Sequence, residues 1–284
     1  MQGMSWYLEH IDWLYTIIYQ NDFFFFDLWS IVHCWSGFVL YISLKALHAK
    51  KPLLILLCIL FIYNVMEVLF IYFALNIFKP ETVNNQFTDI IIGMLGGMIG
   101  FLILRFSSLN KKTQIRNLNL FTIFLASITY AWLWVGFYQY DYNQEFYNSP
   151  GINIGAFVFW VLGAFATIWF STLIRLSNIW LKWLVIWALY LVCLFAVEYF
   201  GFVILSLHES SKANAQPLLF GLIHGTPALH FVYIFSPFFT ISIYKGLQVL
   251  LFKAANVEKS QLKKANASKH RDTDLQQITL QSNK

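Results

Sequence analysis

Histidine and carboxylate side chains lie within stretches of this sequence that are otherwise apolar. His33, Glu67 and Asp89 fall in three consecutive stretches of this kind. An imidazole and a carboxylic acid are the groups that most often exchange protons near neutral pH, provided that they lie within reach of each other. We therefore predict that His33 and Glu67 form an acid/base pair and that Asp89 orients His33 or a cation.

Other interpretations of these residues remain open. Carboxylate oxygens are the ligands of hard cations, so Glu67, Glu81 and Asp89 could instead gather Ca²⁺ or Mg²⁺ against a lipid phosphate. His33 could be a hydrogen-bonded interior histidine, and Asp89 could cap the N-terminus of its helix. A second group of ionisable residues is predicted to bind the substrate: Asp27, Glu81, Glu198, His224 and His230. The structural alternative is that these residues are ordinary interfacial charges or belong to a helix kink.

The elements that position these side chains must lie in a lipid bilayer. Of the 284 residues, 58% are hydrophobic and only 12% are charged, too few to cover a water-soluble globule. The net charge of +5 is small, and its basic residues lie in the connections, which argues against nucleic acid as a partner. Seven stretches are long enough to span, given that a crossing takes about 20 apolar residues: 28–47, 53–78, 87–106, 118–137, 154–176, 180–207 and 218–252.

Lys and Arg follow every odd-numbered stretch, which places those loops in the cytoplasm. We therefore expect an all-α, polytopic integral membrane bundle of about seven transmembrane helices, with the N-terminus outside and the C-terminus cytoplasmic. Residues 1–26 are predicted to be an interfacial amphipathic segment and residues 253–284 a disordered basic tail. Between them we expect a three-span core over 27–112 and four further spans over 113–252, the last kinked or broken at Pro227 and Pro237.

The candidate residues fall in the outer half or near the midplane of the predicted spans. Because a charge at that depth persists mainly where a bundle interior pairs or hydrates it, we expect a polar pocket open to the outside. Small residues in the third span predict close helix packing: Gly93 with Gly97 and Gly96 with Gly100, with Gly37 as a facing notch. The same glycine faces are candidates for pairing two protomers.

The first hundred or so residues resemble the VanZ-like family of small bacterial membrane proteins. The resemblance is carried by Asp27-Leu-Trp-Ser-Ile-Val-His33-Cys-Trp-Ser-Gly37-Phe, by Asn-Val-Met-Glu67, and by Asp89-Ile-Ile-Ile-Gly93-Met-Leu-Gly96-Gly97. Where the family usually has Asn before the glycine, this chain has Ile92. The resemblance implies a bacterial inner membrane protein that handles a lipid or another amphiphilic envelope substrate, and it implies no particular reaction.

A second resemblance covers the same segment. Base-exchange phosphatidylserine synthases have a similar His-Trp-Gly helix, a span with acidic residues, an Asn-Phe-x-Glu stretch and an Asp before glycines. The counterparts here are, in that order, His33 with Trp35, Glu67, Asn76-Ile-Phe-Lys-Pro-Glu81 and Asp89. It implies calcium-dependent exchange of phospholipid headgroups. A non-catalytic receptor or transporter is the third alternative. The seventh span has Ser236-Pro237 without the Asn-Pro-x-x-Tyr that is usual in receptors, and only this span looks broken, whereas a transporter is expected to have matching broken segments in both halves.

Overall fold

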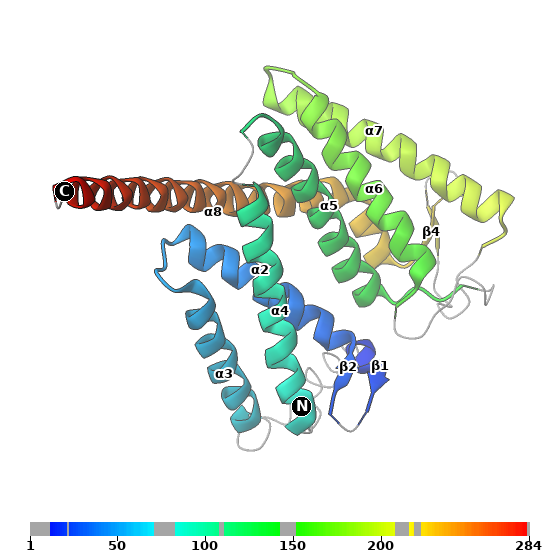
Figure 1. The fold of residues 1–284 in the computed structure, drawn as a ribbon. Coiled ribbons are helices and arrows are strands. Elements are labelled where there is room, and N and C mark those ends of the chain that lie inside the picture. The colour runs from blue at the N-terminus through cyan, green and yellow to red at the C-terminus, as the bar shows by residue number, and fades with distance from the viewer. Residues whose placement is uncertain are drawn as a thin grey trace. The chain divides into compact units, whose positions relative to one another are not determined.

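A computed structural model of the chain describes residues 12–21, 23–70, 83–107, 111–142, 152–207, 216–218 and 223–282. This part of the chain is mainly helical (Figure 1). Its α-helices are α2 (Leu28–Ala46), α3 (Pro52–Phe70), α4 (Val83–Ser107), α5 (Lys111–Tyr138), α6 (Ile154–Leu173), α7 (Ile179–Tyr199) and α8 (Pro227–Ser282). Shorter elements are η1 (Asp12–Tyr15), the π-helical turn η4 (Phe200–Ile204), and the strands β1 (Ile17–Gln20), β2 (Phe25–Asp27), β3 (Gln216–Leu218) and β4 (Ile223–Gly225).

Six of these helices, α3 to α8, are long and apolar enough to cross a membrane, which agrees with an integral membrane protein. The first predicted span, 28–47, forms α2 but is not among the six. Its 19 residues include Ser30, His33, Ser36, Ser43 and Lys45, which lower its mean hydropathy. The crossing of α2, and with it the count of seven, stays a prediction, as does the orientation of the chain.

The chain divides into two compact units. The α2–α4 unit contains α2 from Ser30 onward, α3, α4, the start of α5 and the part of α8 from Val249 onward. The α5–α8 unit contains the two ribbons, most of α5, α6, α7 and α8 up to Gln248. Asparagines begin two helices of the second unit, since the Asn153 side chain accepts from the Ala156 amide and the Asn178 side chain from those of Trp180 and Leu181.

Glycine sets the packing of the α2–α4 unit, as the sequence predicted. A Cβ on Gly37 would overlap the backbone of Gly93, and a Cβ on Gly96 would overlap the Cys34 carbonyl, so α2 and α4 touch backbone to backbone. On α3 the partners are side chains instead, with Leu60 against Gly93 and Leu56 against Gly97. Figure 1 shows α3 and α4 alongside each other, with α2 packed on α4. Pairing of protomers through these glycines stays a prediction.

The start of the last helix differs from the sequence prediction of a span over 218–252. α8 begins at Pro227, and the Leu229 amide donates to the Thr226 hydroxyl at 3.4 Å. Proline is favoured at the first helical position, where its missing N–H costs nothing, and the residue before it prefers extended backbone. The predicted break at Pro227 is therefore a helix start, whereas Pro237 lies inside the helix.

The segment after residue 252 also differs from the predicted disordered tail. α8 continues through it to Ser282, and Ala254, Ala255 and Val257 are buried. These small and apolar residues recur at helical spacing and give this part of the helix a face that packs. Within the predicted interfacial segment, β1 and β2 form an antiparallel ribbon in which Ile17 pairs with Asp27.

Candidate functional site

The contact between α2 and α4 places His33 against Asp89. His33 lies one turn before Gly37 on α2, and Asp89 lies one turn before Gly93 on α4, so the close approach of the glycines brings this pair together. The His33 Nε2 atom is 3.5 Å from Asp89 Oδ2. Asp89 is 1% exposed and His33 is buried as well. Sequence reasoning had placed these two residues on neighbouring helices, and the structure confirms that they meet.

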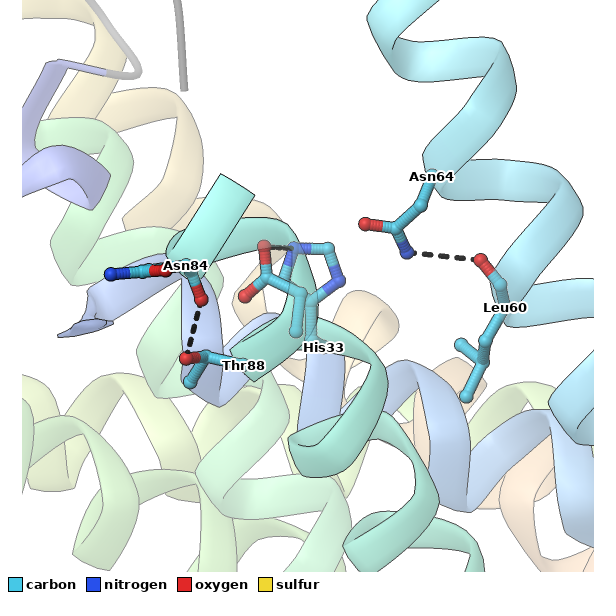
Figure 2. A network of polar contacts seen from close by, with 6 residues as sticks. His33, Leu60, Asn64, Asn84 and Thr88 are labelled. Atoms are coloured by element: carbon cyan, nitrogen blue, oxygen red, sulfur yellow. Dashed lines mark hydrogen bonds and ion pairs between the residues drawn. The ribbon is translucent and has the colours of Figure 1, made fainter. Parts of the chain in front are cut away.

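The capping interpretation of Asp89 is wrong. α4 begins at Val83, so Asp89 lies in the second turn of the helix and not at its N-terminus. Next to it, the Thr88 hydroxyl donates to the carbonyl of Asn84 at 2.8 Å (Figure 2). The predicted start of the third span at residue 87 was too late because the polar run from Asn84 to Gln86 is helical.

Helix α3 contributes a polar face toward His33. The ring of Tyr63 lies edge-on to the His33 imidazole, with 6.2 Å between the ring centroids. Glu67 follows Tyr63 by one helical turn, so both lie on the same side of α3. Asn64, one turn before Glu67, is buried and donates from Nδ2 to the Leu60 carbonyl at 2.9 Å (Figure 2). The three helices that carry His33, Glu67 and Asp89 therefore present polar groups to one region.

Two buried acceptor atoms on α3 are not satisfied by hydrogen bonds among the described residues. Glu67 Oε2 and Asn64 Oδ1 are buried and have no hydrogen-bond partner among the described residues. An unsatisfied buried acceptor costs about 1–3 kcal/mol, so its retention calls for a role such as contact with a ligand. Asn64 was missed in the sequence analysis, although its spacing of three residues before Glu67 in an apolar helix was a usable signal.

Three other predicted site residues belong to the α5–α8 unit. Asp27 is buried in β2, and Glu198 lies in the last turn of α7, where it accepts a hydrogen bond from the Tyr233 hydroxyl. His230 is half-buried in the first turn of α8, and its Nε2 atom has no hydrogen-bond partner among the described residues.

Two further predicted residues cannot be placed in the site. His224 pairs opposite Pro217 in the β3–β4 ribbon, so the prediction that it lies within the seventh span is corrected. Glu81 lies outside the described residues. Within the described part of the chain, no group of three or more His, Cys, Asp or Glu side chains is arranged to hold a metal ion. The Ca²⁺ or Mg²⁺ interpretation therefore stays a prediction that depends on Glu81.

A second buried charge cluster in the same unit escaped the sequence analysis. Lys45, at the end of α2, forms an ion pair with Glu258 of α8 and donates to Gln261 Oε1 at 2.6 Å. Arg105, at the end of α4, has Nη1 3.6 Å from Glu258 Oε1. The acid lies far along the chain from both bases, in a segment that we expected to be disordered, so no local pattern pointed to it.

The sequence was compared with protein-family models, with curated proteins and with solved structures, and none of them matches it.

Proposed function

We propose that this multi-pass membrane protein carries out acid/base chemistry on a lipid or another amphiphilic envelope substrate, with His33, Glu67 and Asp89 as the reacting site. The observation that carries the proposal is the His33–Asp89 contact beside an α3 face that bears the buried Glu67. A structural salt bridge alone would not account for the free Glu67 acceptor.

Each residue has a definite role in this scheme. In this scheme the Asp89 carboxylate, 3.5 Å from His33 Nε2, holds the proton on that nitrogen, which fixes the tautomer and leaves Nδ1 as the proton acceptor. His33 then takes the proton of a hydroxyl group as its oxygen forms a bond to an electrophilic atom of the substrate, and the protonated Glu67 gives its proton to the oxygen whose bond to that same atom breaks. The two proton transfers balance, since one group gains a proton as the other loses one.

The site should act at the level of the lipid headgroups or just below them. On the predicted topology, His33 lies roughly 9 Å below the outer end of its helix at about 1.5 Å of rise per residue. Such a position suits the polar end of an amphiphile whose chains stay in the bilayer. The VanZ-like resemblance of residues 27–112 points to the same substrate class.

The test is untargeted lipidomics of a strain that lacks the gene and is complemented with wild-type protein or variants. We expect wild-type protein to restore a headgroup-specific change in the lipid profile and Glu67→Gln to abolish it. His33→Gln should do the same, because removal of a general acid or base costs about 10²–10⁴-fold in rate. Asp89→Asn should retain partial activity, since it leaves His33 in place.

Asp274→Asn in the distal part of α8 is the matched carboxylate-to-amide control and should complement fully. Membrane levels of all variants are compared by immunoblotting. Full complementation by Glu67→Gln at wild-type level would contradict the proposed chemistry.

A further inference from the structure

The α5–α8 unit contains a cavity of about 510 Å³ between α6, α7 and the start of α8. This volume lies within the range of about 300–1,000 Å³ that is typical of small-molecule sites. Apolar and aromatic side chains of α6 and α7 form most of the wall, including Phe159, Phe170 and Leu189. The wall suits a hydrocarbon chain.

One end of the cavity is polar. Glu198 lines it and accepts a hydrogen bond from the Tyr233 hydroxyl, which comes from α8. Directly after Glu198, the helix widens into the π-helical turn η4, in which the Leu205 amide donates to the Phe200 carbonyl at 3.0 Å. Glu198 lies six residues, or roughly 9 Å, before the end of the apolar stretch Ile179–Ile204.

Aromatic rings surround this polar end. Tyr140, Trp160 and Tyr233 all line the cavity, and the rings of Trp160 and Tyr233 lie 5.9 Å apart. Tyr140 accepts hydrogen bonds from Trp160 Nε1 at 2.9 Å and from Trp134 Nε1 at 3.0 Å. Burial raises the pKa of the Tyr140 hydroxyl well above the ordinary value, so the ring stays neutral. Tyr140 and Tyr233 belong to a packed core against which Trp160 lies.

The lining indicates the charge of the ligand. Among the described residues that line the cavity, Glu198 is the acid and there is no Lys, Arg or His to bind an anion. Tyrosine and tryptophan faces attract cations, and aromatic cages are the usual recognition sites of quaternary ammonium groups.

We propose that this cavity binds an organic ammonium group carried on a hydrocarbon chain, with the Glu198 carboxylate and the aromatic rings around the cation and the apolar wall around the chain. Zwitterionic phospholipids with a choline headgroup and single-chain amines share this chemistry. The residues involved differ from His33, Glu67 and Asp89, so loss of this binding and loss of the proposed acid/base chemistry can be distinguished.

The test uses the full-length protein in a neutral maltoside detergent and a dodecyltrimethylammonium probe with a diazirine in its chain. After irradiation, peptide mapping locates the cross-links, and unlabelled dodecyltrimethylammonium, dodecanol and dodecyl sulfate compete with the probe. We expect cross-links on α6 and α7. The ammonium should compete at least about tenfold better than dodecanol, as a desolvated cation–π contact beside a carboxylate provides.

Variants separate the contribution of the headgroup from that of the chain. Glu198→Gln should remove most of the preference for ammonium while leaving competition by dodecanol unchanged, which also shows that the cavity is intact. Tyr233→Phe, which removes the hydrogen bond to Glu198, should weaken the preference severalfold. The matched control is Tyr199→Phe, because Tyr199 is exposed and does not line the cavity. Glu67→Gln should keep the full preference.

Nanodiscs then identify the source of the ammonium group. Displacement of the probe by phosphatidylcholine but not by phosphatidylglycerol would support a lipid headgroup, and displacement by single-chain amines alone would support a free amphiphilic amine. Equal competition by dodecanol and dodecyltrimethylammonium would overturn the proposal, as would stronger competition by dodecyl sulfate. An unchanged preference in Glu198→Gln would overturn it as well.

Discussion

The two ends of the α2–α4 helix pair bury carboxylates in opposite ways. At one end, Glu258 is held by Lys45 and Arg105, with Gln261 bonded to the lysine. At the other, Glu67 lies on α3 one helical turn from Tyr63, whose ring contacts His33, and keeps a buried oxygen without a hydrogen-bond partner among the described residues. Both acids are similarly buried, at 5% exposure for Glu258 and 7% for Glu67. The extent of burial alone therefore does not distinguish the two acids.

The two ends differ in whether a basic side chain pairs with the buried carboxyl group. Glu258 has a cation in contact and a second one nearby, which is what a buried charge needs in order to stabilise a fold. Glu67 contacts no cation within the described residues, so it contributes no ion pair to the fold, and a substrate would supply the partner that its buried oxygen lacks. A structural acid and a functional acid can thus be distinguished by what surrounds them.

The largest expected effect comes from the contact that both ends share. Gly96→Leu would force a side chain into the Cys34 carbonyl, so α2 and α4 must separate. We expect loss of folded protein, measured as monodisperse yield in detergent. Gly246→Leu is the matched control, since no atom lies within 4 Å of the position that a Cβ on Gly246 would take. A normal yield of Gly96→Leu would show that the backbone contact does not hold this unit together.

The second largest effect is expected at the compensated end. Glu258→Ala leaves Lys45 buried without its acid and should lower the free energy of unfolding by about 3–5 kcal/mol. The double variant Lys45→Met/Glu258→Met should recover most of this loss, because replacing both charges by apolar groups removes the unpaired one. Thermal unfolding in detergent measures both. A double variant as unstable as Glu258→Ala would mean that the ion pair is not what the fold depends on.

The smallest change in stability is expected at the other end. Glu67→Gln should alter the free energy of unfolding by less than about 1 kcal/mol, or raise it, because no described salt bridge is lost. The same thermal assay applies. If Glu67→Gln were as destabilising as Glu258→Ala, Glu67 would be a structural residue and the contrast between the two ends would disappear.

Local patterns in the sequence predicted the helical membrane class and the meeting of His33 with Asp89. The glycines at 37, 93 and 96 set that contact, and the four-residue spacing of Gly93 from Gly97 and of Gly96 from Gly100 is visible in the chain. The partners of Lys45 were not predictable in the same way, because Glu258 lies more than two hundred residues away. The start of α8 was also missed, since apolar residues 218–223 looked like helix and only Pro227 indicated otherwise. Hydropathy does not distinguish a short apolar ribbon from a helical turn.

The contacts of α4 with its two neighbouring helices differ in kind. Against α2, α4 presents main chain to main chain, which has no rotamers to change. Against α3 it meets the ends of Leu56 and Leu60, which can adopt other conformations at little cost. His33 and Asp89 are therefore carried by two helices that meet through their main chains, whereas Glu67 is carried by a helix that meets α4 through leucine side chains. A substitution that changes the size of Leu56 or Leu60 would thus alter the distance of Glu67 from the pair without separating His33 from Asp89.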